Sequence, residues 1–203
     1  NITEISSRDN AFVKELRRLS RESGMYRKLG HIWLEGDHLC RAALTRGLQP
    51  KVAVFSKSFW PQAPVEWVQA ANKVVVLDDA LFAEISGLES PAHIGYVLPW
   101  VAGEQLLPDA AAVVLDRVQD AGNVGSILRS ASAFGFKQVV AMKGNAALWS
   151  QKVLRAGMGA HFALHLVEGV EPAALQQLQV PLLVTSSHRG NLIHQSALPW
   201  PCA

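Results

Sequence analysis

Residues 114–134 read VLDRVQDAGNVGSILRSASAF, an apolar strand followed by a polar turn and a helix. We expect the strand over residues 110–116 and the helix over residues 124–134. Asn123 stands where an N-cap would satisfy the free amides of the first helical turn. A buried strand that leads through a short polar turn into a helix is typical of an α/β unit.

The predicted helix has two distinct faces. Apolar residues recur at helical spacing and should pack inward; these are Val124, Ile127, Leu128, Ala131 and Phe134. The opposite face holds small residues such as Gly125 and Ser126, with one long cation, Arg129. Small residues allow another surface to approach closely, and an isolated arginine there can hold a phosphate or polarise a hydroxyl. A lone exposed arginine is also commonly just solvated, and Gly125 could serve only for close packing.

Strands and helices alternate on both sides of this stretch. Before it, we expect strands at residues 31–35, 51–56, 73–77 and 93–98, with helices at 7–20, 37–45, 65–71 and 81–85. After it, we expect strands at 138–142, 162–167 and 182–186, with helices at 151–156 and 172–178. This alternation predicts the α/β class with a largely parallel sheet. Residues 99–108 are punctuated by Gly and Pro and are expected to link one unit, residues 1–98, to a second, residues 109–203.

Composition narrows the class of protein. The 203 residues are 49% hydrophobic and 18% charged with a net charge of +2, which fits an ordinary globular chain. Its apolar runs are too short to span a bilayer, so we expect no membrane association. The chain carries no signal-peptide pattern, and its two cysteines, Cys40 and Cys202, are far apart without metal-type spacing. We therefore expect a reduced, cytoplasmic protein.

Cations cluster near the N-terminus. Lys14, Arg17, Arg18 and Arg21 are spaced i, i+3, i+4, i+7 and share one helical face, and Arg27 follows shortly after. Such a stripe is either a solvated face or a set of phosphate contacts for a polyanion, and the spacing alone leaves both open.

Other chemistries find little support. The turn GNVG at residues 122–125 is not the G-x-G-x-x-G fingerprint, so a nucleotide-binding α/β protein is a weak alternative. Ser126 lacks the Gly-x-Ser-x-Gly context of a nucleophile elbow. His161 and His165 lie on or beside a predicted strand, where residues four apart are separated by about 13 Å. That separation argues against a metal pair, and we expect no metal.

Residues 115–135 closely resemble motif 1 of the SpoU/TrmH family of RNA ribose 2′-O-methyltransferases, in the SPOUT superfamily. Residues 150–160, SQKVLRAGMGA, are similar to the second recognisable stretch of that family. Residues 7–19 and 34–36 resemble the start of the small substrate-binding domain common in it. The resemblance covers nearly the whole chain.

The resemblance implies a function. It places Asn123 and Arg129 in a catalytic centre beside the target ribose, with S-adenosylmethionine as methyl donor. Because a guanidinium stays protonated, Arg129 is better suited to bind phosphate and stabilise the developing alkoxide than to act as a base. The substrate is expected to be structured RNA, ribosomal rather than transfer RNA, contacted by the basic stripe, Arg27 and Arg155. A homodimer is also expected.

The sequence departs from the family pattern at two points. The usual Ser of the second stretch is Gly157, which puts a hydroxyl contact there in doubt. The later motifs that bind the donor and thread the C-terminal trefoil knot have no match after Leu192, so we expect an incomplete methyltransferase unit, inactive as written. Thr185 and Ser186 are the nearest candidates for donor contacts. The alternative is a non-catalytic RNA-binding module that keeps the fold without a donor site.

Overall fold

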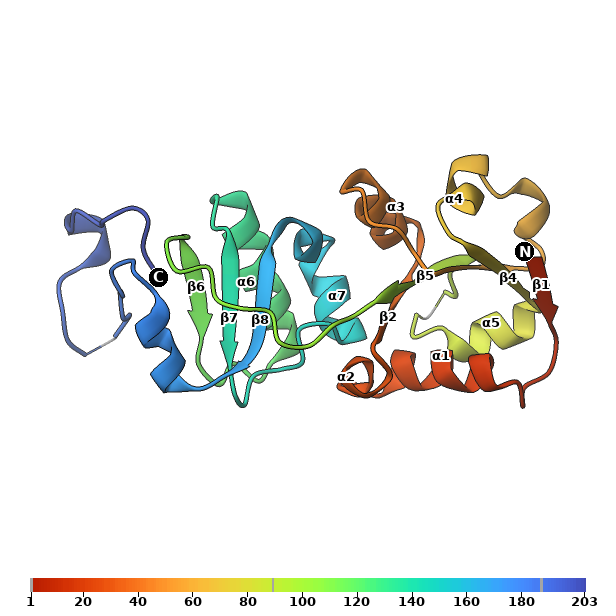
Figure 1. Cartoon of the computed structure of the whole chain (residues 1–203), viewed down its shortest axis with the longest axis horizontal. Coiled ribbons are helices and arrows are strands. Elements are labelled where there is room, and N and C mark those ends of the chain that lie inside the picture. Colours follow the sequence, from red (N-terminus) through yellow and green to blue (C-terminus); the bar gives the residue numbers. More distant parts are fainter. Residues whose placement is uncertain (1, 89, 187) are drawn as a thin grey trace.

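The protein is described by a computed structural model that covers residues 2–88, 90–186 and 188–203. Two sheets lie side by side along the long axis of the molecule (Figure 1). The N-terminal sheet has five strands in the order β1-β4-β3-β5-β2, and the C-terminal sheet has three in the order β6-β7-β8. The α/β class is therefore confirmed for both parts of the chain.

The N-terminal sheet is mixed rather than largely parallel. Its strands are β1 (Ile2–Ile5), β2 (His31–Glu35), β3 (Val52–Ser56), β4 (Lys73–Leu77) and β5 (Ile94–Pro99). β3 and β1 pair in parallel with β4, but β5 runs antiparallel to both of its neighbours, β3 and β2. The prediction was wrong here because apolar patterning marks a buried strand without specifying its direction.

Helices cover both faces of this sheet (Figure 1). One face carries α1 (Ala11–Arg21), α2 (Met25–Leu29) and α5 (Asp79–Ile85), and the other carries α3 (Asp37–Thr45) and α4 (Val65–Gln69). α1 follows the predicted amphipathic pattern, because Val13, Leu16 and Leu19 are its buried residues. β1 and α2 were not predicted; both are short, and β1 is largely exposed.

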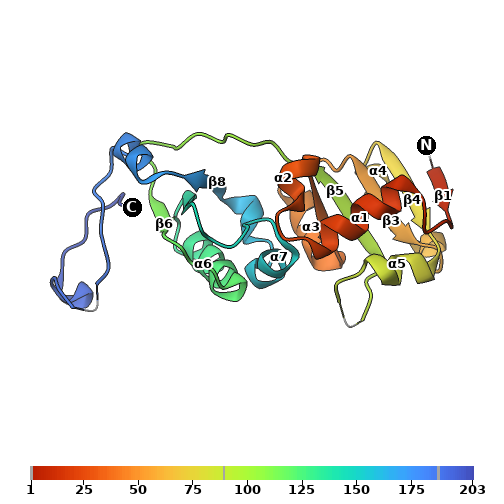
Figure 2. The same cartoon turned by 90° about the horizontal axis from the view of Figure 1, so that it is seen from below.

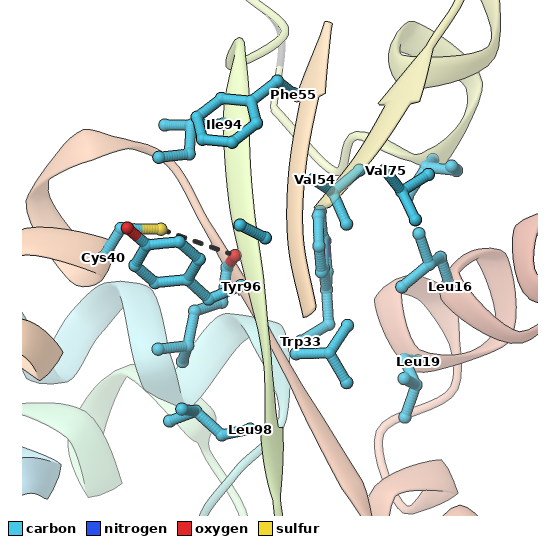
Figure 3. Packing of buried hydrophobic residues seen from close by; sticks show 14 of the residues in the cluster. Leu16, Leu19, Trp33, Cys40, Val54, Phe55, Val75, Ile94, Tyr96 and Leu98 are labelled. Carbon is cyan, nitrogen blue, oxygen red and sulfur yellow. Dashed lines mark hydrogen bonds between the residues drawn. The ribbon is translucent and has the colours of Figure 1, made fainter. Parts of the chain in front are cut away.

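The N-terminal core lies on both sides of the sheet. Figure 3 shows Leu16 and Leu19 beside Trp33 on one side of β5, with Cys40 and Tyr96 on the other. Trp33 fills the space above Gly95, where an added Cβ would lie 2.0 Å from the indole ring. Burial raises the pKa of the Cys40 thiol, so that side chain acts as a small apolar group.

The C-terminal sheet is parallel throughout. β6 (Ala112–Leu115), β7 (Gln138–Met142) and β8 (His165–Val170) pair in sequence order. α6 (Ala121–Ala133) and α7 (Gln151–Gly157) lie on one face of this sheet (Figure 2). The predicted helix at residues 172–178 is a 3₁₀ helix, η3 (Pro172–Gln177).

Residues 182–186 do not form the predicted strand. The apolar run Leu182-Leu183-Val184 suggested one, but Val184 is 91% exposed and the segment has no neighbouring strand. Among the described residues, Leu183 N donates to Ala203 O, and Ala203 N donates to Pro181 O just before the segment. A run of apolar residues becomes a strand only where a sheet edge accepts it.

The two units share buried contacts. The Gln151 side chain on α7 donates from Nε2 to Trp33 O at 2.7 Å, and both residues are buried. Leu154, also on α7, is fully buried within the N-terminal apolar cluster. No helix among the described residues is long and apolar enough to cross a membrane.

Candidate active site

The helix that carries Asn123 and Arg129 begins one turn earlier than predicted. α6 starts at Ala121, and its N-cap is Asp120, whose carboxylate accepts the Asn123 backbone N–H at 2.7 Å. The expectation that Asn123 is the N-cap is therefore wrong. Asparagine and aspartate both cap helices well, and here Asp120 rather than Asn123 is the N-cap. Asn123 lies in the first turn, and its exposed side chain makes no hydrogen bond within the described part of the chain.

Asn123 and Arg129 lie at two edges of one exposed arc of α6. Six residues apart on a helix, they are separated by about 120° around the axis, with Ser126 between them. All three are exposed. Within the described part of the chain, the Arg129 side chain makes no hydrogen bond or ion pair. Folding thus leaves one guanidinium available on this surface.

The sequence suggested that Gly125 lies on that exposed face, but the structure places it elsewhere. It is buried where α6 packs on α7, and an added Cβ would lie 2.3 Å from the Ala156 Cβ and 2.8 Å from the Gly157 backbone N. Gly125 therefore lets the two helices approach closely, the packing role that was left open above.

The β6–α6 loop, residues 116–120, is fastened by a single side chain. Asn145 accepts the Val118 N–H at 2.6 Å and donates from Nδ2 to Leu115 O at 2.8 Å and Met142 O at 2.6 Å. Ala146 N adds a hydrogen bond to Val118 O at 2.9 Å. The β7–α7 loop, residues 143–150, thus holds the ends of β6 and β7 and the start of the proposed site together.

The β6–α6 loop contains a strained residue. Arg117 has φ 54°, in the left-handed region that non-glycine residues rarely adopt. Its guanidinium pairs with the adjacent Asp116 carboxylate at 3.0 and 3.1 Å. Gly144 packs against it, and an added Cβ there would lie 3.1 Å from the Arg117 Cγ. The β6–α6 and β7–α7 loops therefore pack closely against each other.

Gly157 stands in place of the family's serine because a buried histidine occupies the space. An added Cβ at Gly157 would lie 2.6 Å from Cε1 and 2.9 Å from Nδ1 of His161. His161 Nε2 bonds to Leu148 O at 2.8 Å, whereas its Nδ1 has no partner among the described atoms. Burial lowers the pKa of His161 to about 4, so the ring is neutral. His165 bonds instead to Gln105 O, so the two histidines serve separate contacts.

The predicted RNA-contacting cations of α1 are engaged within the chain. Lys14 pairs with Asp9, Arg17 with Glu84 and Arg18 with Glu22, and Arg21 donates to Glu84 O. The side chains of Lys14 and Arg18 are still about half exposed, at 53% and 51%. Exposed ion pairs of this kind are weak and can exchange for phosphate contacts.

The remaining predicted site residues are dispersed. Arg27 pairs with Glu168 of the C-terminal unit at 2.7 Å, and Arg155 donates to Gly87 O at 3.4 Å. Thr185 and Ser186 are exposed and lie outside any helix or strand. The predicted site residues that share an element are therefore Asn123 and Arg129 on α6 and the four cations of the basic stripe on α1.

Sequence reasoning missed the residues that hold the site in place. Asp120 caps α6 through the Asn123 N–H, whereas Asn145 and Glu168 act through bonds to residues distant in sequence or in the other unit. The one local signal was Glu168, an acid within the apolar run HLVEGV. A charge inside a buried strand requires a partner, which the sequence could not identify.

Comparisons with known proteins bear on both units. Residues 110–203 match the model of the SpoU rRNA Methylase family, and residues 10–95 match the MRM3-like substrate binding domain. A protein from Synechocystis named as an uncharacterized tRNA/rRNA methyltransferase is 30% identical over 199 residues, covering 95% of this chain and 69% of that protein. The chain belongs to the SpoU family. It thus consists of an N-terminal substrate-binding domain and a SpoU methyltransferase domain.

Human mitochondrial rRNA methyltransferase 3 is 34% identical over 154 residues, which cover 71% of this chain. The matched part spans only 36% of the human protein. Among solved structures, an RNA 2′-O ribose methyltransferase is 25% identical with a TM-score of 0.73, covering 98% of this chain and 80% of that one. An AdoMet-bound rRNA methyltransferase from Sinorhizobium meliloti shares the fold, with a TM-score of 0.74 at 23% identity over 89% of this chain and 71% of that one.

Proposed function

We propose that the protein transfers a methyl group from S-adenosylmethionine to a ribose 2′-hydroxyl of ribosomal RNA. The observation that carries the proposal is the exposed arc of α6, where Asn123 and Arg129 flank Ser126 in a SpoU methylase sequence. The solved relative named as an RNA 2′-O ribose methyltransferase supports the ribose as the site of transfer. The human relative, an rRNA methyltransferase, supports ribosomal over transfer RNA.

Arg129 would bind the phosphate beside the target nucleotide and stabilise the negative charge that develops on the 2′-oxygen. Its lack of a partner within the described chain supports this role, since no internal carboxylate has to be displaced. Asn123 would orient the ribose by hydrogen bonds from the opposite edge of the arc. The contribution of these two residues would be mainly to hold the 2′-hydroxyl in one orientation.

S-adenosylmethionine supplies an electrophilic methyl group when bound. Thr185 and Ser186 stay our proposed contacts for it, but both are exposed and could line only one wall. As exposed residues outside any helix or strand of the described chain, they do not enclose a pocket. We also propose that a polypeptide of these 203 residues alone does not methylate RNA. A ligand of this size binds tightly when most of its surface is buried. Calorimetry should therefore detect only weak donor binding; micromolar affinity would contradict this.

The N-terminal domain would position the RNA. We propose that residues 1–98 bind it through Lys14, Arg17, Arg18, Arg21 and Arg27, joined by residues 99–108 to a methyltransferase unit at 109–203 with Arg155 as a further contact. The match of residues 10–95 to a substrate binding domain supports this division. Arg17 pairs with the Glu84 carboxylate and Arg21 donates to the Glu84 backbone carbonyl, so RNA phosphates would have to outcompete both contacts.

We propose a homodimer in the cytoplasm. Support for association comes from Phe134, a large apolar side chain that is 77% exposed at the end of α6. Beside it lies a shallow hollow lined partly by Ile127 and Phe136. The free thiols of Cys40 and Cys202 suit a reducing compartment. Sedimentation of the full-length protein should give twice the monomer mass, and a monomer at micromolar concentration would contradict the dimer.

The experiment that tests the activity is transfer of labelled methyl groups by the full-length protein to ribosomal and transfer RNA. We expect label in ribosomal RNA lacking the modification. If neither ribosomal nor transfer RNA became labelled, the non-catalytic RNA-binding alternative would be favoured.

A further inference from the structure

Glu168 on β8 lies where the two domains meet the β7–α7 loop. Its side chain is only 11% exposed. It accepts the Tyr26 O–H at 2.6 and 2.9 Å on its two oxygens and Arg27 Nη2 at 2.7 Å, both from α2 of the N-terminal domain. It also accepts the backbone N–H of Leu148, within the β7–α7 loop, at 3.0 Å. One carboxylate of the C-terminal domain thus contacts both α2 of the N-terminal domain and the β7–α7 loop.

Tyr26 is suited to be a permanent donor in this cluster. Burial raises the pKa of its hydroxyl well above the usual value, and the nearby Glu168 charge raises it further. The hydroxyl therefore keeps its proton across the working pH range. The Tyr26 ring also packs edge-on against Trp100, at the start of the linker, with 5.2 Å between ring centroids. The ring contact and the hydrogen bond together fix the orientation of this donor.

The β7–α7 loop passes this anchoring on to the proposed site. From Leu148 the loop leads back to Ala146 and Asn145, which hold the Val118 carbonyl and N–H. Val118 lies three residues before Ala121, the first residue of α6. Hydrogen bonds at both ends of residues 145–148 therefore connect α2 of the substrate-binding domain to the loop that precedes α6.

We propose that Glu168 is a positioning residue for methyl transfer: it fixes the β7–α7 loop, and through Asn145 the β6–α6 loop, against α2 of the substrate-binding domain. The catalytic part of this inference rests on the proposed function, whereas the structural part does not. A small misplacement of a catalytic group has a large effect on rate. Loss of the Glu168 contacts should therefore lower kcat more than it weakens RNA binding.

The test uses the full-length protein with Glu168→Gln and Tyr26→Phe. Glutamine retains one acceptor but turns an NH₂ group toward a donor, and phenylalanine removes only the O–H. Tyr96→Phe is the matched control, because the Tyr96 hydroxyl donates to Trp67 O at 3.0 Å entirely within the N-terminal domain. Glu66→Gln, at an exposed position on α4, controls for the change in charge.

Two quantities are measured in each variant: steady-state kinetics on RNA, and hydrogen exchange at the Val118 amide. We expect Glu168→Gln to lower kcat about 10-fold with KM within about twofold, and Tyr26→Phe to lower kcat about threefold. Val118 exchange should quicken in both variants. In both controls, kcat and Val118 exchange should stay at wild-type values, even if Tyr96→Phe lowers the melting temperature.

Unchanged Val118 exchange in Glu168→Gln would contradict the claim that Glu168 fixes these loops, whatever the kinetics. Faster exchange with wild-type kcat would overturn the positioning role. If the wild-type protein transfers no methyl group to RNA, the proposed function fails, and Val118 exchange still decides whether Glu168 holds the loop.

Discussion

Arg129 differs from Arg17, Arg18 and Arg27 because it forms no ion pair within the described chain. Each of those three arginines pairs with a carboxylate. Its position on α6 carries no core contact, so its removal should leave the fold intact. An arginine that does not contribute to the fold is available for a ligand.

We therefore expect Arg129→Ala to lower methyl transfer by the full-length protein by at least about 100-fold, a loss of roughly 3 kcal/mol in transition-state stabilisation. Arg129→Lys should fail as well, because an ammonium cannot reproduce the planar fork. Arg46→Ala, at an exposed arginine that directly follows α3 of the N-terminal domain, is the control. Near-normal turnover in the lysine variant would contradict a specific guanidinium role.

His161 makes stability depend on pH in a defined direction. Its pKa is lowered by burial to about 4 in the folded protein, against 6.5 for the free side chain. The unfolded chain therefore binds the proton first as the pH falls, and the folded state loses stability between about pH 6.5 and 4, by up to about 3 kcal/mol. Below that window the loss is complete, and above it the neutral ring contributes no pH dependence.

Urea unfolding at a series of pH values measures this effect. His161→Leu should flatten the pH dependence in that window, although it also removes the bond to Leu148 O. His188→Ala, at an exposed histidine, should keep the wild-type dependence. Equal slopes in wild-type and His161→Leu would contradict the assignment.

At the scale of elements, the sequence predicted well what depends on local periodicity. The burial of Val124, Leu128 and Ala131 in α6, the burial of Val13, Leu16 and Leu19 in α1 and the parallel strands around α6 follow from it. Phe134 was wrongly predicted to pack inward: it follows the last turn of α6 and is 77% exposed. Strand direction in β5, the absence of a strand at 182–186 and the burial of Gly125 did not, because each depends on a partner distant in sequence. The same holds for the site: Asn123 and Arg129 were recognisable from their motif, whereas the long-range bonds of Asn145 and Glu168 were not.

The basic face of α1 gives a prediction at this scale. Lys14→Glu with Arg18→Glu reverses the charge of two half-exposed members of the stripe and should weaken RNA binding. Because two fewer phosphates would be neutralised, the slope of log K against log salt should become shallower by about 1.5. Arg46→Glu with Lys57→Glu makes the same charge change away from α1 and should leave the slope unchanged. An unchanged slope in the α1 variant would identify the stripe as a solvated face.

At the scale of the whole molecule, the two domains are joined by more than a linker. α7 belongs to the C-terminal domain, yet Leu154 packs in the N-terminal core and Gln151 bonds to the backbone of Trp33 in β2. Figure 1 shows α7 on the side of its domain that faces β2. RNA held by the substrate-binding domain would thus keep a fixed relation to the exposed arc of α6, as an in-line transfer requires.

The most direct test of ribose methylation is mass spectrometry of ribosomal RNA digested to nucleosides after incubation with the full-length protein and labelled S-adenosylmethionine. We expect a single 2′-O-methylated nucleoside carrying the label, and none with Arg129→Ala. A labelled methyl group on a base, or no labelled nucleoside at all, would contradict the proposed function.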